Sequence, residues 1–298
     1  MTVKHFLTLD DLPKPDLLAI VRRAQELKLQ PELARTAPRK TLGLIFEKSS
    51  TRTRAAFEVA MTQLGGSSLF LASADSQLGR GEPIEDSARV LSSMVDCMAI
   101  RTYEHSKLEL FAEYSKVPVI NALSNDFHPC QLLADVQTFI EHRGDISGKR
   151  VAWIGDGNNM CQSYINAAVA FDFELAIAAP PGFEPSAELL GKHQARVSLS
   201  QDPASAVKNV DLVVTDVWAS MGQEAEQHER ESAFAGFQVN AEMMSLANSD
   251  ALFMHCLPAH RGEEVSAELL DADSAVVWDE AENRMHSQKA LLEYLLDQ

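Results

Sequence analysis

The stretch Val151–Ala178, VAWIGDGNNMCQSYINAAVAFDFELAIA, decides the fold that we expect. It opens with the apolar run Val151–Gly155 and closes with a second run, Leu175–Ala178, and both are typical of buried strands. Between them, Met160–Phe171 carries apolar residues at helical spacing. A strand, a helix and a second strand in this order predict two parallel strands joined by a crossover helix.

The same alternation continues in both directions along the chain. Strands are expected at Leu42–Phe46, Ser68–Leu71, Cys97–Thr102, Pro118–Asn121, Val151–Gly155, Leu175–Ala178, Leu212–Asp216, Ala251–Cys256 and Ala275–Trp278. Helices are expected at Pro15–Leu29, Thr53–Leu64, Ile84–Val95, Lys107–Tyr114, Gln131–Glu141, Met160–Phe171, Ala241–Ala247 and Glu280–Leu296. The fold class is therefore α/β, with two doubly wound parallel-sheet domains.

The chain of 298 residues has room for two domains. The polar segment His142–Lys149 separates a predicted helix from a predicted strand, which favours domains at residues 1–142 and 143–280. The C-terminal helix, residues 281–298, is expected to pack back on the first domain. The segment Ser220–Gly236 has few helix or strand signals and is expected to form a long lid-like loop.

Composition excludes several classes of function. With 43 acidic and 26 basic residues, a formal net charge of -17 disfavours binding to nucleic acid or to an anionic membrane. No apolar run reaches the roughly 18 residues of a membrane span, and the N-terminus lacks signal-peptide order, so a cytoplasmic protein is expected. The four cysteines form no CxxC pair, which favours reduced thiols over a disulfide framework or a zinc ribbon.

Ligands of open parallel sheets bind beyond the carboxyl ends of the strands, so the residues after each strand are the candidates for a binding site. These are Glu47–Thr53, Arg101, His128, Asp156–Asn159, Asp216–Met221 and Cys256–His260. We expect one active site in a cleft between the two domains.

The run Ser50–Thr53 follows a predicted strand and opens a predicted helix. Hydroxyls, backbone N–H groups and arginines at the positive end of a helix dipole suit a phosphate group. The alternative is an ordinary N-cap with a solvated arginine beside it. We expect Arg52 to take part in the chemistry and Arg54 to be structural.

Two other motifs permit different interpretations. Gly155–Met160, GDGNNM, lacks the third glycine of a dinucleotide-binding turn because Met160 occupies it, and no acidic residue ends the next strand, so a nicotinamide cofactor is disfavoured. His255 and Cys256 within HCLPAHRG suggest a metal site. As neighbours in a strand they would point to opposite faces, which disfavours zinc.

Four further residues have a structural and a functional interpretation. His128 is a loop histidine or a cleft residue, and Gln131 can recognise a carbonyl or an amino group. Asp216 is a cap or holds an ammonium group. Arg101 forms a structural ion pair or faces the ligand.

The motifs together resemble those of the aspartate/ornithine carbamoyltransferase family, from about Leu7 to about Leu296. They are FxKxSTRTR, QLGRGE followed by EDSARVLSSM, HPCQ, GDGNN, DVWASMG and HCLPAHRG. The resemblance implies a carbamoyl-phosphate-binding first domain and an amino-acid-binding second domain. It implies transfer of a carbamoyl group to an amine without a cofactor, a metal or a covalent enzyme intermediate.

The resemblance also implies roles for individual residues. Phosphate binding falls to Ser50, Thr51, Arg52 and Thr53. The carbonyl and amide of carbamoyl phosphate fall to Arg101, His128, Gln131 and Arg284. Gln77 belongs to a loop that reaches a neighbouring subunit's site, which implies a homotrimer, or a multiple of trimers, with shared active sites. The amino acid falls to Asn159, Asp216, Ser220 and Met221, whereas Cys256 and Leu257 flank the reacting centre and also contact carbamoyl phosphate. The expected catalytic residues are Arg52, Arg101, His128, Cys256 and Arg284.

The second domain determines the acceptor. Aspartate-specific relatives carry a proline where Cys256 stands, and Asp216 suits a cationic side chain, so the resemblance favours ornithine. Another acceptor, such as aspartate, putrescine or acylated ornithine, is the runner-up, and a non-catalytic binding protein is a further alternative. Citrulline formation would serve arginine biosynthesis or arginine degradation.

Overall fold

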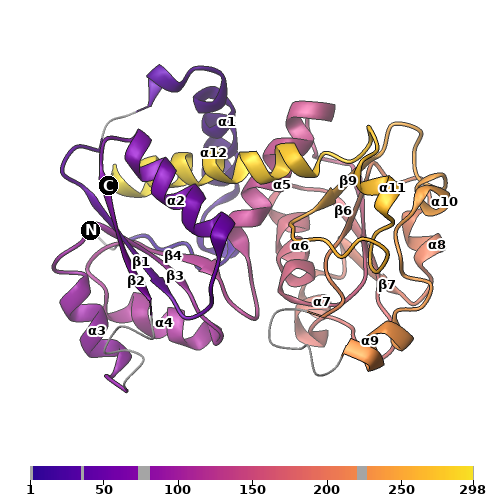
Figure 1. Cartoon of the computed structure of the whole chain (residues 1–298), viewed down its shortest axis with the longest axis horizontal. Helices are drawn as coiled ribbons and strands as arrows, with labels where there is room; N and C mark the ends of the chain where they lie inside the picture. Colours follow the sequence, from indigo (N-terminus) through magenta and orange to yellow (C-terminus); the bar gives the residue numbers. More distant parts are fainter. Residues whose placement is uncertain (1–2, 35–36, 73–80, 220–226, 298) are drawn as a thin grey trace. The chain divides into compact units, whose positions relative to one another are not determined.

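The computed structural model describes residues 3–34, 37–72, 81–219 and 227–297. The chain forms two compact units, one of Met1–Gln137 with Glu282–Gln298 and the other of Thr138–Ala281. The changes from one unit to the other fall inside α5 (Pro129–Arg143) and α12 (Val277–Leu296). Each unit holds one parallel sheet flanked by helices (Figure 1), which confirms the prediction of two α/β parallel-sheet domains.

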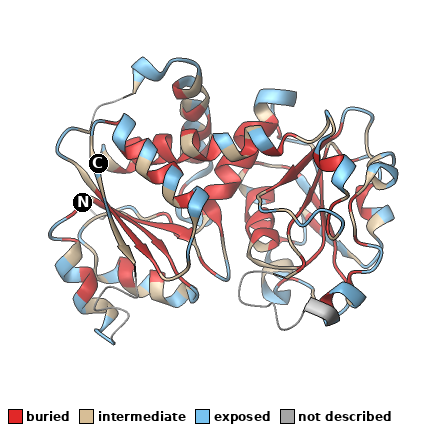
Figure 2. Cartoon of the chain, viewed as in Figure 1, coloured by how far each residue is buried: buried red, intermediate tan, exposed pale blue. Residues whose placement is uncertain are grey.

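The first unit is built on a four-stranded parallel sheet in the order β2-β1-β3-β4. Its strands are β1 (Thr41–Phe46), β2 (Ser67–Ala72), β3 (Cys97–Arg101) and β4 (Val119–Leu123). The inner strands β1 and β3 are almost wholly buried, because helices cover both faces of the sheet (Figure 2).

Two layers of helices enclose this sheet (Figure 1). On one face, α3 (Ile84–Leu91) and α4 (His105–Tyr114) pack against apolar side chains of the strands. On the other face lie α1 (Lys14–Leu29), α2 (Thr51–Gln63) and the C-terminal part of α12. Helix α12 is fixed there by Glu293, which accepts from Arg23 Nε at 2.8 Å, and by Lys289, which donates to Gln63 Oε1 at 2.8 Å.

The second unit contains a five-stranded parallel sheet in the order β7-β6-β5-β8-β9. Its strands are β5 (Arg150–Ile154), β6 (Glu174–Ala178), β7 (Val197–Ser200), β8 (Leu212–Thr215) and β9 (Leu252–His255). Its helices are α6 (Asn159–Ala170), α7 (Ala187–His193), α8 (Pro203–Val207), α9 (Gln227–Ala233), α10 (Ala241–Met244) and α11 (Ala267–Leu270). Phe234, Leu269 and Leu270 join the strands in one apolar cluster.

One predicted strand is wrong. Ala275 forms only an isolated bridge with Phe253, and Val277 already begins α12, so Ala275–Trp278 is no strand. Strand β7 was not predicted, because VSLS alternates apolar and polar residues over only four positions. Helix α9 lies within the segment Ser220–Gly236 that was expected to be irregular. Within the described residues, no helix is long and apolar enough to span a membrane.

Candidate active site

The start of α2 supplies the first part of the site. Ser50 caps the helix, since its Oγ accepts from the backbone N of Thr53 at 3.3 Å. Thr51 and Arg52, in the first turn, are exposed, and that turn contains no acidic residue. The N-cap interpretation is therefore correct for Ser50. It leaves the positive end of the helix dipole open to an anion beside Arg52.

Arg54 is engaged elsewhere. Its Nε contacts Glu58 Oε1 at 2.8 Å, one helical turn further along α2. Its guanidinium also lies over the Phe70 ring, 3.7 Å from the ring centroid. These contacts agree with the structural role expected for Arg54.

Two buried arginines converge on the Thr53 hydroxyl. Arg284 Nη2 donates to Thr53 Oγ1 at 2.6 Å, and Arg101 Nη1 donates to the same oxygen at 3.5 Å. Thr53 is 1% exposed, Arg101 8% and Arg284 4%. A hydroxyl has two lone pairs and one proton, so Thr53, accepting twice, has its own O–H to donate. The cluster presents hydrogen-bond donors and two positive charges in a poorly solvated setting.

His128, which precedes α5, is buried in the same unit. Its burial holds the pKa of the imidazole well below the usual range, and the positive charges of Arg284 and Arg101 lower it further. The imidazole is consequently neutral at pH 7 and can donate one ring N–H without carrying charge.

This pKa predicts an acid-sensitive contribution to stability. Because the folded-state pKa of His128 lies below the unfolded value near 6.5, the unfolded chain binds the proton more readily, and the free energy of unfolding falls as pH drops below about 6.5. We expect His128→Gln to remove up to one proton from this dependence, about 1.4 kcal/mol per pH unit. Urea unfolding of both proteins between pH 7 and pH 5 measures the difference, and parallel curves would contradict the buried neutral histidine.

In the second unit, several polar groups converge on the carboxylate of Asp216. It follows β8 and is 8% exposed. Its Oδ2 accepts from Asn158 Nδ2 at 2.9 Å, and its Oδ1 accepts from the backbone N of Val217 at 2.8 Å and from Cys256 Sγ at 3.3 Å. These donors fix the carboxylate, which is suited to a cationic group.

Asn158 makes this contact with Asp216. Asn158 caps α6, its Oδ1 accepting from the backbone N of Met160 and Cys161, so its Nδ2 is directed to the carboxylate. Asn159 is the first residue of α6 and is half-buried. Asn158 lies in the range Asp156–Asn159 singled out from the sequence, but no role was predicted for it, although an asparagine before a helix is a recognisable capping signal.

The chain after β9 carries Cys256 and Leu257. Leu257 adopts a left-handed backbone conformation, with φ of 56°. Its backbone N donates to His255 Nδ1 at 2.9 Å, so the ring proton of His255 lies on Nε2, which donates to Glu264 Oε1 at 3.0 Å. His255 and Glu264 are fully buried, and together they hold the strand end in place.

Contrary to the prediction from strand alternation, His255 and Cys256 do not point to opposite faces. Possible ligand atoms of Asp216, His255 and Cys256 all lie within 4.8 Å of one another. Cys256 lies beyond the end of β9, so the alternation of side chains along a strand does not separate it from His255. Both ring nitrogens of His255 are nevertheless occupied by the hydrogen bonds to Leu257 and Glu264.

The glycines after β5 have a structural explanation. Gly155 has φ of 135°, which residues with a side chain rarely adopt, and a Cβ on Gly157 would clash with the backbone of Glu184 and Pro185. Both glycines therefore permit a sharp turn and close backbone packing. The N-terminus of α6 is capped by Asn158.

Comparisons with known proteins determine the family. Residues 4–141 match the carbamoyl-P binding domain of aspartate/ornithine carbamoyltransferase, and residues 147–295 match its Asp/Orn binding domain. The chain belongs to the aspartate/ornithine carbamoyltransferase family. The ornithine carbamoyltransferase of Methylococcus capsulatus is 64% identical over 296 residues, covering 99% of this chain and 99% of the relative. An enzyme of Pseudomonas savastanoi pv. phaseolicola, named ornithine carbamoyltransferase 1, anabolic, is 58% identical over 299 residues, covering 99% and 98%.

Solved structures of the carbamoyltransferase family share the fold. The ornithine carbamoyltransferase of Burkholderia thailandensis has a TM-score of 0.91 and 50% identity, with 99% of each chain covered. The enzyme of Pyrococcus furiosus has a TM-score of 0.92 and 45% identity, covering 97% of this chain and 96% of that chain. Both structures are similar to this chain over nearly its whole length, which confirms the family resemblance predicted from the motifs.

Three of the residues that the family motifs assign to the site lie outside the described part of the chain. They are Gln77, Ser220 and Met221. Their roles stay predictions. The other assigned residues are described, and the first unit brings Thr53, Arg101 and Arg284 together, while the second unit brings Asp216 to Cys256.

Arg230, in α9, is a buried arginine that none of the sequence motifs singled out as a candidate. Its Nη1 donates to Asp156 Oδ2 at 2.8 Å and to the backbone O of Trp218 at 2.7 Å, and its guanidinium lies 4.9 Å from the centroid of the Phe183 ring. Arg230 thus connects the chain after β5 with the chain after β8. In the sequence, Arg230 has acidic neighbours on both sides, so we had no reason to expect its side chain to be buried.

Three of the four cysteine thiols are poor candidates for a nucleophile, because they are buried and protonated near neutral pH. Cys97, Cys130 and Cys161 are buried and free. Burial raises the pKa of Cys130 to about 12 and raises the pKa values of the other two thiols, so all three are protonated near neutral pH. Only Cys256 is partly exposed, and its Sγ donates to Asp216.

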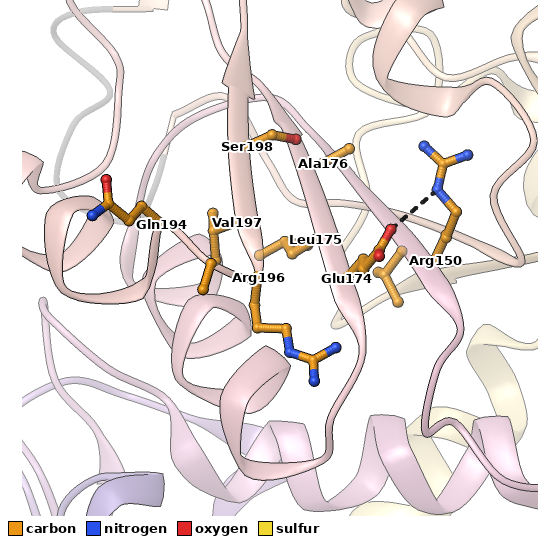
Figure 3. A pocket seen from close by; sticks show the side chains of 10 residues that line it. Arg150, Glu174, Leu175, Ala176, Gln194, Arg196, Val197 and Ser198 are labelled. Carbon is orange, nitrogen blue, oxygen red and sulfur yellow. Dashed lines mark ion pairs between the residues drawn. The ribbon is translucent and has the colours of Figure 1, made fainter.

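A separate pocket of about 180 Å³ lies where strands of the second sheet begin, at the end opposite to Asp216 and Cys256 (Figure 3). It is lined where β5, β6 and β7 begin, and it includes Arg150 and Glu174, whose Nε and Oε2 atoms are 3.6 Å apart. Asp216 and Cys256 follow the carboxyl ends of the strands in that sheet. Within this unit, the pocket is therefore distinct from Asp216 and Cys256.

Proposed function

We propose that this chain transfers the carbamoyl group of carbamoyl phosphate to the δ-amine of L-ornithine, giving L-citrulline and phosphate. The observation that carries the proposal is the convergence of Arg101 and Arg284 on the Thr53 hydroxyl beside neutral His128. Such a cluster stabilises the oxyanion of an attacked carbonyl. The relatives named ornithine carbamoyltransferase support ornithine as the acceptor.

Carbamoyl phosphate is assigned to the first unit. The proposed phosphate ligands are the hydroxyls and backbone N–H groups of Ser50, Thr51 and Thr53, with the Arg52 guanidinium. Arg101, His128 and Arg284 donate to the carbonyl oxygen, and Gln131 contacts the carbamoyl amide. Gln77 completes the phosphate site from a neighbouring subunit.

Ornithine is assigned to the second unit. Asp216, held by Asn158 and Cys256, accepts from an ammonium group of the substrate. The proposed ligands for the rest of the amino acid are Asn159, Ser220 and Met221. Cys256 and Leu257 lie next to the reacting atoms.

The nucleophile is the neutral δ-amine, whose free pKa is about 10.4. Presenting it neutral at pH 7 corresponds to roughly 3 pKa units, about 4 to 5 kcal/mol. Desolvation and the arginine charges lower that pKa. The amine nitrogen then bonds to the carbonyl carbon, the carbon–oxygen bond to phosphate breaks, and phosphate accepts the amine proton. Holding the two substrates in contact supplies much of the rate, and the chain contributes no covalent intermediate.

The physiological setting extends this proposal. The relatives that are named anabolic favour arginine biosynthesis over arginine degradation. We infer a cytoplasmic enzyme that assembles as a homotrimer, or a multiple of trimers, with shared sites. Carbamoyl phosphate and ornithine are its proposed partners, and it uses neither a cofactor nor a metal.

A colorimetric citrulline assay tests the acceptor. With carbamoyl phosphate present, we expect ornithine to react at least about 100-fold faster, in kcat/KM, than aspartate, putrescine or acetylornithine, because only ornithine combines a free α-ammonium group for Asp216, an α-carboxylate and a second amine as the nucleophile. Mass spectrometry of each mixture identifies the carbamoylated product. Preference for any of the other three would replace the acceptor, and no carbamoyl transfer at all would favour a binding protein.

A further inference from the structure

Helix α5 contains a buried polar pair, Gln131 and Asp135. The two residues are four positions apart and thus lie on the same helix face. Gln131 Nε2 donates to Asp135 Oδ1 at 2.9 Å, with Gln131 fully buried and Asp135 2% exposed. The backbone N of Gln131 also donates to the backbone O of His128 at 3.2 Å, so the pair begins one turn from the neutral histidine.

The hydrogen bond to Asp135 determines the orientation of the Gln131 amide, that is, the positions of Oε1 and Nε2. The two ends of a glutamine amide have nearly the same shape, and only their partners distinguish oxygen from nitrogen. Gln131 Nε2 donates to Asp135 Oδ1, so the NH₂ end faces Asp135. Oε1 is then the amide atom directed away from Asp135, and it acts only as an acceptor.

Three of the other polar side chains in this unit's site supply donors. Arg101, Arg284 and the Thr53 hydroxyl all offer N–H or O–H groups, which suit the carbonyl and phosphate oxygens. Carbamoyl phosphate also carries an NH₂ group, which needs an acceptor. An amide turned the other way would place NH₂ against NH₂, leaving a buried donor without a hydrogen bond.

We propose that Asp135 is a positioning residue that holds the Gln131 amide with Oε1 toward the substrate, and so selects a carbamoyl group over an acyl group that lacks NH₂. The proposal rests on the proposed function, since it takes carbamoyl phosphate as the substrate. It resolves the two interpretations of Gln131 in favour of an amino group.

Two unreactive analogues of carbamoyl phosphate measure the preference for an NH₂ group over a CH₃ group. Phosphonoacetamide and 2-oxopropylphosphonate differ only by NH₂ in place of CH₃ beside the carbonyl. Their inhibition constants against carbamoyl phosphate are measured in the citrulline assay with the full chain. We expect the wild type to prefer the amide, and Asp135→Asn to reduce the ratio of the two constants by about tenfold, because asparagine holds either end of the Gln131 amide. The inhibition constant of inorganic phosphate should stay within about twofold.

A double-mutant cycle separates positioning from a merely structural role. In a Gln131→Ala background, Asp135→Asn should leave the ratio unchanged, because the amide through which it acts is absent. Asp135→Ser, whose hydroxyl both donates and accepts, should lower the ratio as Asp135→Asn does and serves if the asparagine variant fails to fold.

The possible failures are distinguishable. A wild type that prefers phosphonoacetamide together with an unchanged ratio in both Asp135 variants overturns the positioning role alone. An equal loss of preference in the Gln131→Ala background also overturns it. A wild type that binds neither analogue and makes no citrulline overturns the proposed function, and the role of Asp135 with it.

Discussion

Replacing Arg52 with alanine is expected to lower kcat/KM for carbamoyl phosphate by roughly 10³-fold or more, about 4 kcal/mol of transition-state stabilisation. Arg52 is exposed in the first turn of α2, where backbone N–H groups and the helix dipole already favour an anion. The lost guanidinium would have paired with the departing phosphate, whose charge increases in the transition state. Steady-state citrulline kinetics measure the loss. The melting temperature should change by less than about 2 °C, because the side chain is exposed.

Arg54→Ala is the matched control. Arg54 lies two residues further along the same helix, paired with Glu58 and stacked on Phe70. We expect kcat/KM within about twofold of wild type and a loss of about 0.5–1 kcal/mol in the free energy of unfolding. Near-normal turnover in Arg52→Ala would contradict the phosphate assignment. An equal kinetic loss in Arg54→Ala would show that the whole turn, rather than one guanidinium, matters.

The sequence predicted the site residues that follow strands. Arg101 ends β3, Asp216 follows β8 and Cys256 follows β9, and each strand is a short, buried apolar run. Parallel strands place their carboxyl ends along one edge of a sheet. For this reason, recognising strands was enough to single out these positions before any contact was known.

Contacts between distant elements could not be predicted in this way. Thr53 and Arg284 are 231 positions apart, and their hydrogen bond depends on how α12 packs against α2. Arg230 lies in a short helix between acidic neighbours, and only the tertiary structure buries it against Asp156. Propensity and periodicity describe local structure and contain no information about such pairs.

The end of β9 shows where a periodic rule fails. Strand alternation was applied to Cys256, which lies just past β9. Alternation no longer holds where the backbone leaves its regular conformation, and functional residues of parallel sheets stand at these boundaries. The hydrogen bond from Asn158 to Asp216 likewise depends on the capping geometry at the start of α6, which strand and helix periods do not describe.

Asp216→Asn is expected to lower kcat/KM for ornithine by about 10²- to 10³-fold while changing the inhibition constant of phosphonoacetamide by less than about twofold. The substitution keeps the size of the side chain but removes the negative charge that would hold the substrate's ammonium group. One of the two oxygens that accept from Asn158 and Cys256 is also replaced by a donor. Kinetics at saturating carbamoyl phosphate, with ornithine varied, measure the loss.

Asp211 provides a control at the other end of the same strand. It precedes β8, and its carboxylate accepts from the backbone N of Arg150 at 2.9 Å and from Asn248 Nδ2 at 3.0 Å. Asp211→Asn should therefore lower stability by about 1 kcal/mol and leave kcat/KM for ornithine within about twofold. If Asp211→Asn and Asp216→Asn reduce that kcat/KM equally, the loss stems from the fold of the second unit, and the assignment of ornithine to the carboxyl end of β8 is wrong. If Asp216→Asn instead weakens phosphonoacetamide binding as much as ornithine use, the carboxylate serves the first substrate too.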